Sequence, residues 1–155
     1  MKNTYRTVYD RVADVLCITA LIGTFLWLFI RWDTFPEQIA MHYNAAGEID
    51  RYAERGALLI LPVIGCVIYG ILALVGYIPN AWNIPIKVTE ENEERVFRIM
   101  THFVSTLKMA ILLFVTFITV CSAQALNLPT WVGFLLLGLI ALTIVYYTTK
   151  LHKAK

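Results

Sequence analysis

Charged side chains are scarce in this chain: Asp, Glu, Lys and Arg make up 15% of its 155 residues, whereas 59% are hydrophobic. Soluble domains carry about 25% charged residues, so the balance argues against a soluble catalytic domain. The apolar runs also lack sustained alternation of apolar and polar residues, which argues against the strands of a membrane barrel. The bilayer is therefore the expected solvent.

Four long apolar runs predict four transmembrane helices. Each run can cross the roughly 30 Å hydrocarbon layer, which takes about 20 residues at 1.5 Å per residue. The predicted spans are residues 12–30, 57–78, 103–123 and 128–149. They leave an outer loop at residues 31–56 and a cytoplasmic link at residues 79–102. The predicted fold class is all-α, a polytopic membrane protein in which residues 1–155 form a single bundle of four transmembrane helices.

Few residues suggest covalent or metal-based chemistry. The three cysteines all lie inside predicted spans: Cys17, Cys66 and Cys121. A thiol in an apolar span packs as a small apolar group, so we expect no disulfide, no thiolate metal site and no cofactor. The first span follows basic residues but lacks a small-residue cleavage site, which predicts an uncleaved helix instead of a signal peptide.

Lys and Arg gather on one side of the predicted bundle, near the two termini and in the link at residues 79–102. Only Arg31, Arg51 and Arg55 fall on the other side. Because cytoplasmic segments carry the excess of Lys and Arg, the pattern predicts a multi-pass protein of the cell membrane with both termini in the cytoplasm.

The cytoplasmic link is expected to become helical after Thr89, which is placed to cap the helix, and to run into the third span. Its acidic cluster consists of Glu90, Glu91, Glu93 and Glu94. These carboxylates either stabilise the positive end of the helix or form a docking site for a basic cytoplasmic regulator. We expect no direct binding of nucleic acid.

Charges inside a bilayer are costly, and only Asp14 and Lys108 lie appreciably inside the predicted spans. Two interpretations are open. The residues form an intramembrane ion pair that joins the first and third helices, or the long Lys108 side chain extends to the headgroups by itself.

The outer loop holds an imidazole, an amide, a glycine and several charges within residues 35–52. Gly47 allows a positive φ, and Asn44 and Asp50 can bond nearby backbone amides, so a compact loop over the helix ends is expected. One interpretation is a hydrogen-bonded network of His42, Asn44, Asp50 and Arg51 that fixes the loop. Another is capture of a peptide or lipid headgroup by the loop and its aromatic residues.

An enzymatic alternative uses His42, Glu48 and Asp50 around a divalent metal or in acid–base catalysis. The sequence lacks a second histidine one helical turn away, and His102 and His152 are predicted on the opposite side of the membrane. We therefore expect no catalytic residues and no metal site. A small transporter is a further alternative, although Gly65 and Gly70 are more typical of close helix packing.

Two motifs carry a family resemblance. The loop holds Pro36, Ile39, His42, Asn44, Gly47 and Asp50 between two apolar spans, and residues 85–95 precede a long helix. The chain resembles the membrane domain of unknown function at the N-terminus of SdpI-type (sporulation-delaying toxin) immunity proteins. Loops of that family often carry proline where this chain has Ala40. Full-length family members also continue with further membrane helices, whereas this sequence ends at Lys155.

The resemblance implies a bacterial cell-membrane protein that protects against a secreted membrane-active peptide and can report its presence by holding a cytoplasmic repressor at the membrane. We accordingly expect a non-enzymatic immunity or envelope-signalling module. Its expected partners are the bilayer, a peptide toxin or lipid ligand outside and a cytoplasmic regulator, with oligomerisation left open. The expected ligand-sensing residues are Pro36, His42, Tyr43, Asn44, Gly47, Asp50 and Arg51.

Overall fold

A computed structural model describes residues 5–78 and 82–155. Its long helices are α1 (Val8–Arg31), α2 (Ile60–Tyr77), α3 (Glu93–Ala123) and α4 (Trp131–His152). Within the described residues, these four helices are long and apolar enough to cross a membrane. The predicted all-α, four-helix membrane fold is therefore confirmed, and the chain is a multi-pass membrane protein.

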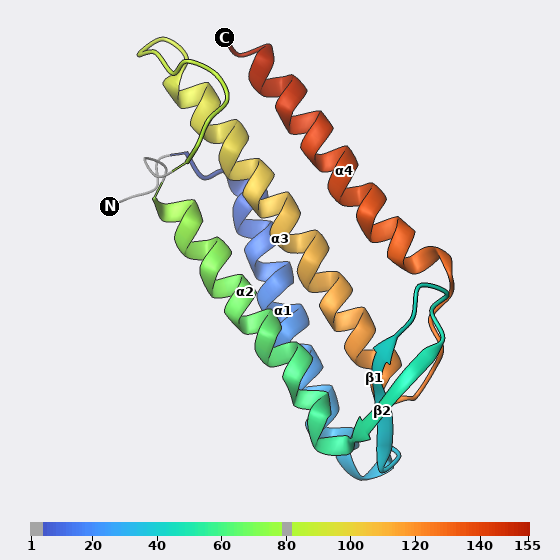
Figure 1. The fold of residues 1–155 in the computed structure, drawn as a ribbon. Helices are drawn as coiled ribbons and strands as arrows, with labels where there is room; N and C mark the ends of the chain where they lie inside the picture. The colour runs from blue at the N-terminus through green and yellow to red at the C-terminus, as the bar shows by residue number, and fades with distance from the viewer. Residues whose placement is uncertain (1–4, 79–81) are drawn as a thin grey trace.

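Helix α3 lies at the centre of the bundle and packs against α1, α2 and α4 (Figure 1). The start of α1 and the end of α4 lie at one end of the bundle, together with the link that precedes α3 (Figure 1). We call this the terminus end. The opposite end, which carries a β-hairpin between α1 and α2, is called the hairpin end.

Buried side chains form narrow stripes along the helices. On α1 they recur every three or four residues at Asp10, Ala13, Cys17, Leu21, Thr24 and Leu28. This spacing keeps one helical face turned toward α3. Large apolar side chains elsewhere are exposed, as Phe29 is at 82%. In lipid this exposure is favourable, so the bundle needs only a thin interior.

The ends of the helices differ in detail from the sequence prediction. Helix α1 begins at Val8, where the backbone N–H of Thr7 donates to Asp10 Oδ2 at 2.7 Å. Helix α3 runs without a break from Glu93 to Ala123, in agreement with the predicted continuous helix. Its N-cap is Asn92, so the prediction that Thr89 caps it is wrong. The Asn92 side chain instead accepts the Thr89 N–H at 2.8 Å, because it closes the turn before the helix.

The outer loop folds into an antiparallel hairpin of β1 (Gln38–Tyr43) and β2 (Ile49–Glu54). Short 3-10 helices, Trp32–Thr34 and Arg55–Leu59, connect it to α1 and α2. The sequence analysis expected a compact loop but not this strand pairing. At the turn, Asn44 Oδ1 accepts the N–H groups of Ala46 at 2.9 Å and Glu48 at 3.0 Å, while Gly47 has φ +82°. These are the local features that reverse the chain.

Candidate functional site

The hairpin is anchored to the helix bundle at its tip and along β1. At the tip, the Leu128 N–H donates to the Gly47 carbonyl at 2.8 Å. The Ile49 N–H donates to Asn127 Oδ1 at 3.0 Å. Along β1, the Ser122 hydroxyl donates to the Ala40 carbonyl. The α3–α4 loop and the end of α3 therefore hold the hairpin in one position.

The anchored hairpin presents a polar pair to the surroundings. His42 Nδ1 lies 2.7 Å from Asp50 Oδ1, and the two side chains are 62% and 42% exposed. An ion pair this exposed contributes only about 0–1 kcal/mol to stability. Arg51 lies opposite His42 in the strand register and makes no ion pair within residues 5–78 and 82–155. Both strands thus present polar side chains that contribute little to the stability of the fold.

The polar residues of the hairpin do not form one network. Asn44 Nδ2 donates to Glu48 Oε2 at 3.0 Å, so Glu48 is held at the turn and not beside the His42–Asp50 pair. The predicted four-residue network is replaced by these two separate pairs, because the turn directs Asn44 inward on its own loop. Among the described residues, no group of three or more His, Cys, Asp or Glu side chains is placed to hold a metal ion.

A cavity of about 330 Å³, the Tyr43 cavity, lies between β1, the hairpin turn and the helices. Its walls include His42, Tyr43 and Asn44 on the hairpin and Phe114 and Leu128 on the bundle. The Tyr43 hydroxyl is buried and has no hydrogen-bond partner within the described part of the chain. Burial raises the pKa of Tyr43 to about 12, so the hydroxyl stays protonated near neutral pH. It is therefore a neutral, buried donor beside this cavity.

Replacing Tyr43 with phenylalanine should leave the thermal midpoint at pH 7 unchanged or slightly raised, because a buried hydroxyl without a partner costs free energy. Because burial disfavours the ionised hydroxyl, the raised pKa of Tyr43 means that the wild type loses stability as the pH rises from 10 toward 12, whereas phenylalanine has no group to ionise. The variant should therefore gain on the wild type between those pH values. Thermal unfolding in detergent from pH 7 to 11 measures this, with exposed Tyr52→Phe as control. A lower midpoint of Tyr43→Phe at pH 7 would show that the hydroxyl has a partner.

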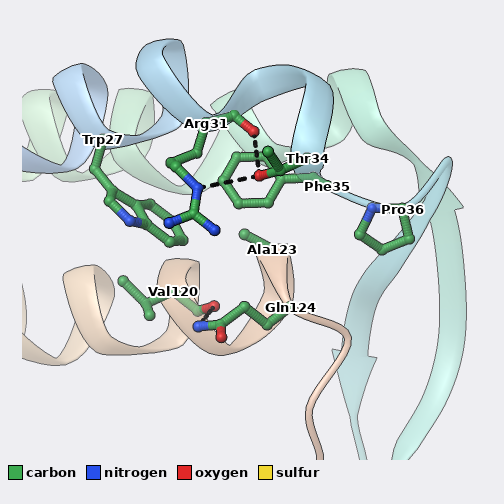
Figure 2. A pocket seen from close by; sticks show the side chains of 8 residues that line it. All are labelled: Trp27, Arg31, Thr34, Phe35, Pro36, Val120, Ala123 and Gln124. Atoms are coloured by element: carbon green, nitrogen blue, oxygen red, sulfur yellow. Dashed lines mark hydrogen bonds between the residues drawn. The ribbon is translucent and has the colours of Figure 1, made fainter.

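A second cavity of about 550 Å³, the Arg31 cavity, lies between the ends of α1 and α3 (Figure 2). It is lined by Trp27, Arg31, Thr34, Phe35, Pro36, Val120, Ala123 and Gln124. The Trp27 and Phe35 rings pack with centroids 5.0 Å apart. Arg31 Nε donates to Thr34 Oγ1 at 3.2 Å, and its guanidinium extends toward α3 (Figure 2). Among the described residues no carboxylate forms an ion pair with Arg31.

The structure distributes five of the seven predicted sensing residues over the two cavities, while Asp50 and Arg51 lie on β2 and line neither. Pro36 lines the Arg31 cavity, whereas His42, Tyr43, Asn44 and Gly47 line the Tyr43 cavity. Sequence reasoning missed Trp27 and Arg31 as parts of the site. Their signal was an arginine at the end of an apolar span, one helical turn after a tryptophan, a combination suited to the lipid headgroup region.

Nearer the terminus end, the intramembrane charges form a cluster of three residues. Lys108 Nζ contacts one oxygen of the Asp14 carboxylate, and Arg6 contacts the other. The Lys108 side chain is only 4% exposed, so it lies between helices and does not extend to the headgroups. Its ammonium lies 5.0 Å from the centroid of the Tyr69 ring. Arg6 was missed as a partner because it precedes the predicted span.

All four glutamates of the acidic cluster before and at the start of α3 are exposed. Glu93 accepts a hydrogen bond from the Tyr5 hydroxyl at 3.1 Å, and Glu94 pairs with Arg98 one turn later. Glu90 and Glu91 lie in the turn before the helix. The cluster therefore places negative charge at the positive end of α3, where the helix dipole favours it.

The apolar helices define an integral membrane protein. The sequence profile of a family described as "Domain of unknown function (DUF1648)" matches residues 19–66, which hold most of α1, the whole hairpin and the start of α2. A protein of Archaeoglobus fulgidus, named "Uncharacterized protein", is 29% identical over 68 residues, 43% of this chain and 37% of that protein. The chain thus aligns with little more than a third of this relative. No solved structure matches the chain.

Proposed function

We propose that the chain is a non-enzymatic peptide-toxin immunity or envelope-signalling module whose hairpin is the ligand-sensing surface. The observation that carries the proposal is the hairpin itself, which is fixed to the bundle yet exposes the His42–Asp50 pair, with His42 at the wall of the Tyr43 cavity. A receptor surface benefits from such preorganisation, because less conformational entropy is lost on binding. The family match over residues 19–66 covers this same hairpin.

In the proposed orientation the hairpin end lies outside the cell and the terminus end in the cytoplasm. The distribution of Lys and Arg supports it, since basic residues are concentrated at the terminus end and in the link before α3. A ligand that arrives from outside then meets the hairpin first. A cytoplasmic regulator would meet the exposed glutamates from Glu90 to Glu94 at the other end.

The chemistry of the two cavities supports a peptide as ligand. The half-buried Trp27 ring, which packs on the buried Phe35, offers apolar surface at the level of the headgroups, where a membrane-active peptide would lie. Arg31 and Arg51 carry positive charges without an ion-pair partner in the described residues, which favours a ligand with an anionic group. The Tyr43 hydroxyl adds a buried donor.

The proposal is tested by toxin-challenge growth of cells that express the intact protein or the His42→Ala/Asp50→Ala variant, with membrane levels quantified. We expect the intact protein to protect the cells. At equal membrane levels, the toxin concentration that cells with the variant tolerate should be at least about tenfold lower, because the variant loses a ligand-contacting polar pair worth over 1.4 kcal/mol of binding free energy. The matched control is Asp33→Ala/Glu37→Ala, which removes two exposed carboxylates at the same end.

Four outcomes would contradict the proposal. Failure of the intact protein to protect removes the immunity role. A parallel loss of membrane level in the His42→Ala/Asp50→Ala variant assigns the pair to folding. Loss of protection that chelation of divalent ions reproduces would favour the metal-dependent enzyme with His42, Glu48 and Asp50, and ion flux in vesicles would favour a small transporter.

A further inference from the structure

Two adjoining cavities lie between α3 and α4. The one near the terminus end has a volume of about 490 Å³ and is lined on the helices by His102, Thr106, Lys150 and Leu139 among others. The adjoining cavity, about 350 Å³, lies nearer the hairpin end and is lined by apolar residues of both helices, such as Phe114, Leu136 and Leu139. Leu139 lines both, so the two cavities form one α3–α4 groove.

The polar end of the groove presents hydroxyl groups and one cation. Thr106 Oγ1 lies 2.7 Å from the Tyr9 hydroxyl and 2.8 Å from the Tyr147 hydroxyl. Lys150 Nζ lies 4.7 Å from the centroid of the Tyr146 ring. Within the described residues Lys150 makes no ion pair. Because the Thr106 hydroxyl itself donates to the His102 carbonyl at 2.7 Å, these hydroxyls are bonded within the protein, and the Lys150 ammonium is the group available to a phosphate.

The carboxylate nearest to this polar end does not cancel the charge. Asp10 contacts His102 at 3.5 Å, but it is fully buried beneath the capping turn of α1. Its Oδ2 is bonded by the N–H and the hydroxyl of Thr7. Lys150 is in the last turn of α4, on the far side of the cavity from α1. The cation at the rim is therefore left for a ligand from the membrane.

The length of the groove fits a lipid. Leu139 and Lys150 are eleven residues apart in α4, about 16 Å at 1.5 Å per residue. This is roughly half of the ~30 Å hydrocarbon layer, the depth that one leaflet supplies. A phosphate at Lys150 thus places the glycerol and the acyl chain along the polar cavity, with the chain end near Leu139, where the apolar cavity begins.

We propose that the α3–α4 groove binds one phospholipid with an anionic headgroup, with its phosphate at Lys150 and one acyl chain along the groove toward Leu139. The order of the lining favours a lipid over a helix of a second copy. Along the membrane normal the lining residues change from a cation to hydroxyl groups to purely apolar side chains. A phospholipid changes in the same direction, from a charged headgroup to an apolar chain. The proposal is independent of the sensing role of the hairpin.

The proposal is tested by titrating the purified protein in detergent with phosphatidylglycerol or phosphatidylcholine and counting bound lipids by native mass spectrometry. We expect one phosphatidylglycerol to bind at least about tenfold more tightly than phosphatidylcholine, since the charge contact supplies the difference. Lys150→Gln should abolish this preference, whereas Lys153→Gln, an exposed control beyond the groove, should keep it. Leu139→Trp should block binding of both lipids, whereas lipid-facing Leu137→Trp should not.

Several results would overturn the proposal. Equal binding of the two lipids, unaffected by Lys150→Gln, would mean that only bulk lipid occupies the groove. Displacement of phosphatidylglycerol by millimolar inorganic phosphate, with phosphate binding intact in Leu139→Trp, would make free phosphate the ligand. A dimer that Leu139→Trp dissociates, with no lipid bound to either form, would make the groove an interface between copies of this chain.

Discussion

Replacing Asp14 with asparagine is expected to destabilise the bundle by about 3–5 kcal/mol, the cost of removing one partner from a buried ion pair. Asp14 is the acceptor shared by Lys108 and Arg6, whose side chains are 4% and 19% exposed. Asparagine preserves the shape but removes the negative charge, so two cations are left facing each other at a low-dielectric site. Thermal or denaturant unfolding in detergent measures the loss, with exposed Asp33→Asn as the matched control.

Replacing the cationic partner, Lys108, should lower the stability less than Asp14→Asn does. In Lys108→Met the apolar chain is similar in length, and Asp14 keeps Arg6 as its partner. Adding Lys108→Met to Asp14→Asn should recover a large part of the lost stability, since the double variant no longer buries an unpaired ammonium. An Asp14→Asn protein no less stable than Asp33→Asn, or a double variant no better than Asp14→Asn alone, would show that the cluster does not join α1 to α3.

Replacing Gly47 with alanine is expected to release the tip of the hairpin from the α3–α4 loop. A Cβ at this position would overlap the Leu128 carbonyl oxygen and lie 3.0 Å from its carbonyl carbon. The φ of +82° adds strain of about 1 kcal/mol or more for a residue with a side chain. The hydrogen bond from Leu128 to Gly47 and that from Ile49 to Asn127 should both be lost.

Hydrogen exchange and limited proteolysis of the hairpin measure this release. We expect the protection factors of the hairpin amides to fall at least about tenfold, because the hairpin loses over 1.4 kcal/mol of local stability. Gly56→Ala is the matched control, because its added Cβ meets nothing within 4 Å. The four helices should remain folded in both variants. Unchanged protection in Gly47→Ala would show that the hairpin is not held through its tip. If the hairpin senses a ligand, release of the tip should also reduce the response, although His42 and Asp50 are unaltered.

The accuracy of the sequence analysis follows from the range of the forces involved. An apolar run of span length is helical in a bilayer because each backbone group must be satisfied within its own segment, and this is a local property. Turn chemistry is local as well, so Asn44 and Gly47 could be recognised as turn residues. The start of α3 was misplaced because Thr89 and Asn92 are both acceptable caps, and the packing of the preceding link decides between them.

The sequence by itself determined that this protein crosses a membrane four times and carries a polar loop at one end. Only the tertiary structure decided how that loop is used. Asp14 and Lys108 are 94 residues apart, and Ile49 and Asn127 are 78 apart. Whether such residues meet depends on the rotation and depth of each helix, which hydropathy leaves undetermined. The same packing created the Arg31 cavity and the α3–α4 groove, because cavities arise where side chains of separate helices fail to fill the space between them.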